Sequence, residues 1–152
     1  MSDTYFGICA TCSTTLNSRY HAFNRNIERL QYSPSSAPPQ LRSCIVLHSE
    51  QLAHYCSPEC AEAGASFELE QLGIPLQITG NGPIEPCSKC GKPVNLTVPH
   101  VAYELMDLTE IRQPWLLSIQ AHDSKTVARL CANCDDGLDC EILQARELEL
   151  AV

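Results

Sequence analysis

The 152-residue chain has no long apolar run, few aromatic residues and far fewer basic than acidic side chains. Its longest apolar stretches, such as Trp115-Leu116-Leu117, are much shorter than the roughly 20 residues that a transmembrane helix requires. The first five residues have neither a basic start nor an apolar core, so we expect no secretory signal and a cytoplasmic location. Ten Lys and Arg against eighteen Asp and Glu give a net charge of -8, which disfavours non-specific binding to a phosphate backbone.

The chain also lacks the signatures of common enzymes. It contains no Ser-His-Asp order, no phosphate-binding loop, no HExxH motif and no histidine-rich nuclease signature. Apolar residues make up 44% of the chain, which is enough for a globular core in one domain or two very small ones. We therefore expect a folded protein that is not an enzyme.

Cysteine, in contrast, is abundant. Ten cysteines are present, and eight of them form close pairs: Cys9 and Cys12, Cys56 and Cys60, Cys87 and Cys90, and Cys131 and Cys134. Two thiolates separated by two or three residues can reach one metal ion from a single turn, and two such pairs complete a tetrahedral shell. Neither an export signal nor a thioredoxin-like context around a CxxC pair supports disulfide or redox chemistry. The spacing predicts two structural Zn²⁺ sites, although iron could occupy the same thiolates.

An internal repeat indicates how the pairs combine. Sequential pairing joins the first pair to the second and the third to the fourth, whereas a cross-braced order joins the first to the third and the second to the fourth. The segment Ser49–Cys56 aligns without gaps on Ser124–Cys131, and 43 and 40 residues separate the ligand pairs within the two halves. Two copies of one unit, each closing its own metal site, explain both observations. The break over Thr79–Pro83 then divides the chain into units 1–80 and 81–152.

Each unit shows the same order of predicted elements. A short strand leads into the first cysteine pair, and alternation predicts strands over Val101–Leu108 and Trp115–Ile119. Ser57 is placed to cap a helix over Ala61–Leu72 that ends at Gly73, and a second helix is expected from Asp135 towards Leu150. A knuckle, a hairpin and a second cysteine pair at a helix start form a treble clef. The predicted fold class is α+β: two tandem treble-clef-like zinc units, each a knuckle plus a small antiparallel sheet followed by a helix.

The segment Tyr55-Cys56-Ser57-Pro58-Glu59-Cys60 resembles the F/Y-C-S-x-x-C signature of TRASH, MYM and FLZ-type zinc fingers. The resemblance covers these six residues and the Cys9/Cys12 knuckle. The second unit, with two residues between Cys131 and Cys134, matches less closely. The resemblance implies ligand roles for the cysteines, and it implies metal sensing or trafficking as one possible function.

Several residues outside the cysteine pairs have both a structural and a functional interpretation. Cys44 is expected to be a small buried apolar residue, and Cys140 to lie on the second helix more than one turn from the metal. His48 and His122 occupy similar places before the second ligand pair of each unit. They could be substitute ligands or donors to the ligands, but ordinary strand-end or turn positions are favoured. The proline-rich segment 33–40 is interpreted as a surface loop in preference to a polyproline binding segment.

Three functional hypotheses follow. The first is a non-enzymatic, two-zinc protein-binding, adaptor or regulatory module, whose partner is another protein. That partner would bind strand edges or the acidic helix formed by Asp135, Asp136, Asp139, Glu141, Glu147 and Glu149, although a solvated helix face is the favoured interpretation of that acidic run. The second is a nucleic-acid-associated transcriptional regulator, for which Arg19, Arg25, Arg29 and Arg42 are the only basic grouping. The third is metal sensing or trafficking, which requires an exchangeable ion.

Overall fold

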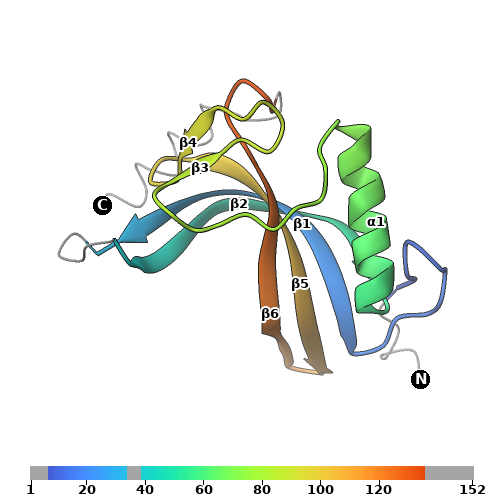
Figure 1. Cartoon of the computed structure of the whole chain (residues 1–152). Coiled ribbons are helices and arrows are strands. Elements are labelled where there is room, and N and C mark those ends of the chain that lie inside the picture. The colour runs from blue at the N-terminus through green and yellow to red at the C-terminus, as the bar shows by residue number, and fades with distance from the viewer. Residues whose placement is uncertain (1–6, 34–38, 136–152) are drawn as a thin grey trace.

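A computed structural model describes residues 7–33 and 39–135 of the chain (Figure 1). The described part contains one helix, α1 (Pro58–Gln71), and six strands: β1 (Arg19–Tyr32), β2 (Leu41–Tyr55), β3 (Ile84–Pro86), β4 (Pro93–Asn95), β5 (His100–Gln113) and β6 (Leu116–Leu130). Within these residues no helix has the length and apolar character needed to cross a membrane.

Four long strands form one antiparallel sheet in the order β2-β1-β5-β6, and β3 and β4 form a separate small hairpin. In the central pair, β1 of the first half runs beside β5 of the second half, from Arg19 opposite Thr109 to Glu28 opposite His100. The predicted fold class is therefore wrong. The described chain is a β-rich fold with one helix, and its main sheet takes two strands from each half, in place of two small sheets that are each followed by a helix.

The long segments between the ligand pairs explain this difference. They were expected to hold small hairpins, but they supply strands of 14 and 15 residues. Strand β1 is buried along almost its whole length and pairs with β2 on one side and with β5 on the other. The expected second helix lies almost entirely outside the described residues, and the assignment of 1–80 and 81–152 as separate units stays a prediction.

Strand β1 had no sequence signal because its centre is polar. Asn24, Arg25, Asn26 and Glu28 are all buried there, although the alternation that marks a half-buried strand requires apolar residues on one face. Arg25 and Glu28 are accommodated because each has an oppositely charged partner. The partners come from the far end of the chain, so a local pattern cannot reveal them.

Helix α1 begins as the sequence predicts. The Ser57 hydroxyl accepts a hydrogen bond from the backbone N–H of Cys60 at 3.1 Å, and Pro58 opens the first turn. After the helix, Gly73 adopts a φ of 76°, which an L side chain rarely adopts. The cap and the terminator are confirmed, while the helix spans Pro58–Gln71 in place of the predicted Ala61–Leu72.

The internal repeat extends over both long hairpins. Strands β2 and β6 have the same length, and their residues are offset by 75 positions, the offset that also separates Cys56 from Cys131. Register shifts fall at matching places, after Phe23 and after Tyr103, and again after Ile27 and after Asp107. The matching rings of Phe23 and Tyr103 stack with their centroids 5.6 Å apart. The two hairpins are thus related by an approximate two-fold axis through the β1–β5 pair.

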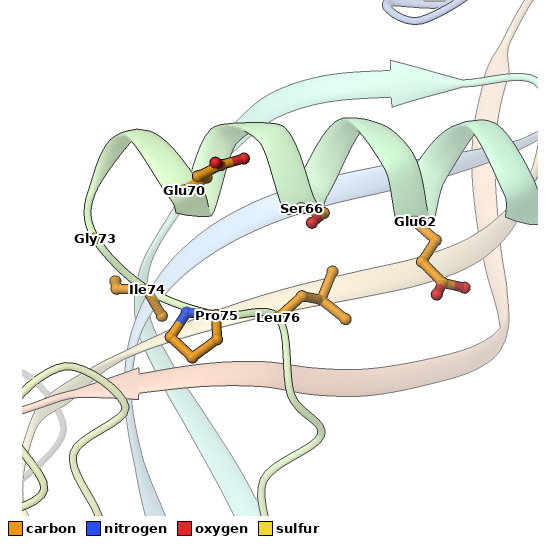
Figure 2. A pocket seen from close by; sticks show the side chains of 7 residues that line it. All are labelled: Glu62, Ser66, Glu70, Gly73, Ile74, Pro75 and Leu76. Carbon is orange, nitrogen blue, oxygen red and sulfur yellow. The ribbon is translucent and has the colours of Figure 1, made fainter.

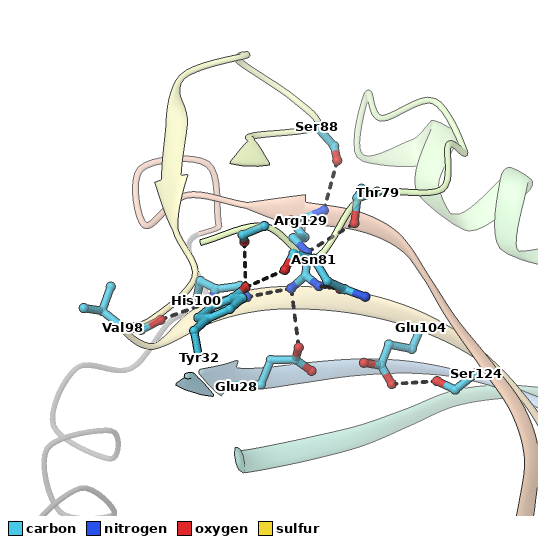
Figure 3. A network of polar contacts seen from close by, with 11 residues as sticks. Glu28, Tyr32, Thr79, Asn81, Ser88, Val98, His100, Glu104, Ser124 and Arg129 are labelled. Atoms are coloured by element: carbon cyan, nitrogen blue, oxygen red, sulfur yellow. Dashed lines mark hydrogen bonds and ion pairs between the residues drawn. The ribbon is translucent and has the colours of Figure 1, made fainter. Parts of the chain in front are cut away.

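A buried guanidinium holds the second half of the sheet together (Figure 3). Arg129 on β6 is 1% exposed, and its Nη1 donates to His100 Nε2 at 2.8 Å and lies 3.4 Å from a carboxylate oxygen of Glu28. Its Nη2 donates to the side-chain oxygen of Asn81 at 2.7 Å. Burial lowers the pKa of His100, which agrees with a neutral ring that accepts this hydrogen bond. The network links three segments that are distant in sequence.

Glu104 lies opposite Asn24 in the centre of the sheet, close to Glu28 (Figure 3). Burial, followed by the nearby charge of Glu28, raises the pKa of Glu104 from 4.5 to about 7. Ser124 donates a hydrogen bond to the Glu104 carboxyl at 3.4 Å. The carboxyl groups of Glu28 and Glu104 therefore lie in one buried region with a single cation, the guanidinium of Arg129. Glu104 keeps its proton through mildly acidic pH.

This pair makes stability depend on pH. Because the folded state raises the pKa of Glu104, its contribution to stability is complete below about pH 4.5 and is lost as the pH rises through about 7. Glu104→Gln should remove this loss, which is on the order of 1–3 kcal/mol. Urea unfolding of the metal-loaded protein between about pH 5 and pH 8 measures the difference. The exposed Glu70→Gln should keep the wild-type slope, and an unchanged slope in Glu104→Gln would contradict the interpretation.

Helix α1 packs closely because its inner residues are small. Ala61, Ala65 and Leu69 are buried, and Gly64 lies against the ring of Tyr55, the last residue of β2. A Cβ atom built at Gly64 would overlap this ring, 2.6 Å from Tyr55 Cζ. The ring belongs to the residue before Cys56 and is 1% exposed, so the surrounding core leaves it little room to move.

Gly64→Ala should therefore destabilise the protein, although alanine normally stabilises a helix by about 1 kcal/mol relative to glycine. We expect a loss of about 1–3 kcal/mol, in the range of overpacked cores, measured by thermal or urea unfolding. Tyr55→Leu should be less sensitive to the added methyl group, so the double variant should be more stable than the sum of the single changes predicts. Stabilisation by Gly64→Ala alone would show that the contact is not tight.

Candidate metal centres

The structure brings the eight predicted cysteines together in two groups of four. One group contains Cys9, Cys12, Cys56 and Cys60, and the other contains Cys87, Cys90, Cys131 and Cys134. Within each group all the sulfur atoms lie within 4.8 Å of one another. The grouping is sequential along the chain and not cross-braced, so each group could hold one metal ion with all four ligands from one half of the chain.

The sulfur spacing has the size of a metal-binding tetrahedron. Cys12 Sγ lies 3.5 Å from Cys56 Sγ, Cys56 Sγ lies 3.8 Å from Cys60 Sγ, and Cys90 Sγ lies 3.7 Å from Cys131 Sγ. Four sulfurs at about 2.3 Å from a central ion are about 3.8 Å apart along each edge of the tetrahedron. A disulfide would require about 2.05 Å. The geometry therefore fits an ion enclosed by thiolates.

A tight turn presents the first pair of each group. In the first knuckle, the N–H of Cys9 donates to the carbonyl of Thr14 at 2.8 Å, and in the second the N–H of Cys87 donates to the carbonyl of Lys92 at 2.8 Å. Ser13 and Gly91, which follow the second cysteine of each pair, both have positive φ, of 66° and 78°. The matching hydrogen bonds and backbone angles show that the two knuckles have the same local conformation.

The knuckles are fastened to the ends of the long strands in the same way. The N–H of Ala10 donates to the carbonyl of His54 at 2.9 Å, and the N–H of Ser88 donates to the carbonyl of Arg129 at 2.7 Å. His54 and Arg129 each stand two residues before the second cysteine pair of their own group. These hydrogen bonds position the strand end so that the later cysteines face the earlier ones.

Electrostatics within each group favour partial ionisation. Hydrogen bonding to Thr14 lowers the pKa of Cys12 to about 6. Burial works against ionisation of Cys87, but backbone hydrogen bonds around the thiol lower its pKa to about 6. Hydrogen bonding to Cys12 and burial raise the pKa of Cys56 to about 12, and contact with Cys131 similarly raises that of Cys134 to about 12. Cys12 and Cys87 therefore ionise readily, while Cys56 and Cys134 need the positive charge of an ion to do so.

The two groups also have the same pattern of burial. The first cysteine of each, Cys9 or Cys87, is buried, the second, Cys12 or Cys90, is exposed, and the later two are half-buried. Four sulfur donors per group satisfy a tetrahedral ion without a water ligand. Each group thus has the composition of a closed site, with one ligand facing solvent.

Among the described residues, Cys44, His48 and His122 lie outside both cysteine groups. Cys44 is exposed on β2, so the expectation of a buried residue is wrong. Neither His48 nor His122 belongs to a cysteine group, and the register aligns His122 with Leu47, one residue before His48. His122 contacts the hydroxyl of Thr109 at 2.5 Å. Cys140 and the acidic residues after Asp135 lie outside the described residues.

Two arginines that support the second group were not identified from the sequence. Arg25 on β1 binds both carboxylate oxygens of Asp135, the residue after Cys134, at 3.2 and 2.8 Å. It also pairs with Glu50 at 2.8 Å. The backbone N–H of Arg129 donates a hydrogen bond to the hydroxyl oxygen of Ser88 at 2.9 Å. The one sequence signal for this supporting role is the position of Arg129, two residues before the pair Cys131 and Cys134.

Comparison with known protein families, curated proteins and solved structures gives no significant match. These comparisons give no support for a TRASH, MYM or FLZ-type family. What the molecule itself establishes is a β-rich fold with two four-cysteine groups that could hold two metal ions.

If each group holds its own ion, single substitutions should remove one ion at a time. Cys60→Ser and Cys134→Ser should each lower the metal content of the purified protein from two ions to one, because a three-thiolate site binds far more weakly. Metal analysis against protein concentration measures the outcome. Cys44→Ser, at an exposed cysteine outside both groups, should retain two ions. Loss of both ions from either single variant would show that the two sites are not independent.

Proposed function

We propose that the protein is a non-enzymatic, two-zinc module that binds another protein as an adaptor or regulator. The observation that carries the metal assignment is the near-tetrahedral spacing of eight thiol groups in two sets of four. Soft thiolate donors select Zn²⁺ among common intracellular ions, and iron is the main competitor. A reducing compartment such as the cytoplasm would keep these cysteines available for metal.

A structural role for the ions is supported by the closed donor sets. A catalytic zinc keeps one position for water or substrate, whereas four thiolates fill the shell. The sites also connect segments about 40 residues apart, so their occupation adds directly to folding free energy. Together with the missing catalytic motifs, this supports a scaffold and not a reaction centre.

Protein binding is supported by apolar side chains at the turn between β5 and β6. Trp115 is 81% exposed, and Leu116, Leu117 and Ile119 are each more than half exposed on the adjoining strand. Clustered exposed apolar residues of this kind are typical of interaction sites, and tryptophan is enriched among residues that dominate binding energy.

The nucleic-acid hypothesis is weaker on the structure. Of the four arginines that form the basic grouping, Arg19 pairs with Asp107 at 2.8 Å, and Arg25 is buried against Glu50 and Asp135. The charges of Arg19 and Arg25 are therefore already balanced within the protein. Phosphate recognition requires exposed cations that are free to displace counterions.

Metal sensing or trafficking is the second candidate, and the exposure of Cys12 and Cys90 favours it. A ligand that faces solvent gives a competing chelator or thiol a place to attack. Rapid exchange of bound ion with isotopically labelled zinc would support trafficking, whereas exchange no faster than unfolding would support a structural site.

Native mass spectrometry of protein purified without added metal, followed by chelator titration under circular dichroism, tests the structural proposal. We expect two zinc ions, whose removal unfolds the sheet. One ion, no ion, or loss of metal without unfolding would contradict it.

Binding through the hairpin end requires a separate comparison. Trp115→Ser should reduce recovery of a specific partner at least tenfold relative to wild type while leaving zinc content and thermal stability unchanged, because this side chain is almost fully exposed. Equal recovery by both proteins would exclude this surface as the binding site.

A further inference from the structure

A groove runs between helix α1 and the extended segment that follows it (Figure 2). Its volume is about 440 Å³, within the range of ligand-binding clefts. Glu62, Ser66 and Glu70 line the helical wall at intervals of four residues, and Ile74, Pro75 and Leu76 line the other wall. One side of the groove is therefore acidic and the other apolar, and no basic side chain lines it.

The apolar wall continues into an extended segment with unpaired backbone donors. The N–H groups of Gln77 and Thr79 donate to the carbonyls of Val127 and Thr126, so this segment runs along β6. In an extended chain, alternate N–H groups point to opposite sides, which turns those of Leu76 and Ile78 away from β6. In the described residues no group accepts a hydrogen bond from either of them. Figure 2 shows Gly73 to Leu76 returning along helix α1 from its C-terminal end.

The dimensions of the groove fit a short extended chain. From Glu62 to Glu70 the helix rises about 12 Å, which corresponds to about four residues of a β-strand. Helix α1 contains four glutamates and no lysine or arginine, so its field attracts cations along this length. A nucleic acid or an acidic peptide would meet like charge on this wall.

We propose that this groove binds an extended peptide segment of a partner protein in which basic and apolar residues alternate. The peptide backbone pairs with the unpaired N–H groups of Leu76 and Ile78, its apolar residues contact Pro75 and Leu76, and its cations lie against Glu62 and Glu70. This assignment rests on the proposed function as a protein-binding module and specifies the partner's chemistry.

The probe is a fluorescein-labelled Lys-Val-Lys-Val-Lys peptide, titrated into the full chain carrying two metal ions and followed by fluorescence anisotropy. Glu62→Gln with Glu70→Gln should weaken binding at least tenfold. The matched control, Glu59→Gln with Glu68→Gln, makes the same change in net charge on the same helix outside the groove and should alter binding less than twofold. Equal weakening by both double variants would reveal non-specific attraction and overturn the proposal.

Two further comparisons test the backbone pairing. A Lys-Lys-Lys-Val-Val peptide has the same composition without alternation and should bind at least fivefold more weakly. Amide chemical shifts of Leu76 and Ile78 should move on addition of the alternating peptide, whereas those of the exposed strand β2 should not. Unmoved shifts at Leu76 and Ile78, or no detectable binding at millimolar peptide, would overturn the proposal.

These experiments also distinguish failure of the proposed groove from failure of the proposed two-zinc scaffold. Zinc content and unfolding on chelation are measured on the same samples, so a two-zinc scaffold that ignores the peptide would reject the groove alone. A wild-type dimer that Glu62→Gln with Glu70→Gln converts to a monomer would assign the groove to a second copy of the chain and would likewise reject a peptide partner.

Discussion

The register of the two long hairpins is the constraint on which the rest of the structure depends. Each hairpin must carry the chain away from a cysteine knuckle and return it beside the same knuckle, since four sulfurs from both ends have to meet around one ion. His21 opposite Tyr55 and Val101 opposite Leu130 are the pairs that close these excursions. A slip of one residue would displace a cysteine by about 3.3 Å, almost a full edge of the sulfur tetrahedron. The matching register shifts in both hairpins maintain this return.

The two halves solve the same packing problem with different chemistry. The first half covers its cysteine group with helix α1, whose small residues Ala61, Gly64 and Ala65 allow close approach to Tyr55. The second half uses ion pairs, with Arg25 reaching Asp135 and Arg129 reaching Glu28. Buried ion pairs contribute little net stability, but a misplaced partner would leave an unpaired charge. These ion pairs therefore add little to the free energy of folding, but they disfavour other arrangements of the two halves.

Metal, sheet and surface charge have connected roles in the proposed module. With two zinc ions bound by eight thiolates, the formal charge moves from -8 towards about −12, which reinforces a preference for basic partners. The ions fix the ends of the hairpins, and the strands project their turn residues away from them. Surfaces at the β5–β6 turn and beside α1 can then stay exposed without loosening the fold, because neither contributes a ligand.

Most of the candidate site could be predicted from the sequence, whereas most of the fold could not. Ligand spacing is local, so the pairs Cys9/Cys12 and Cys87/Cys90 are visible directly, and the repeat before Cys56 and Cys131 indicated their sequential grouping. The cap at Ser57 is local for the same reason. Strand β1 escaped detection because Asn24, Arg25 and Glu28 interrupt its apolar pattern. His48 and His122 are not equivalent, since the offset of 75 residues between the halves places Asp123 at the position equivalent to His48.

The sequence by itself determined the eight ligands, the two-fold repetition and the start of one helix, since each depends on residues close together in the chain. Only the tertiary structure decided that β1 and β5 join both halves in one sheet and that Arg25 and Arg129 are buried with distant acids. These features depend on the pairing of segments about 80 to 110 residues apart, and the free energy of such pairing is set by both partners together.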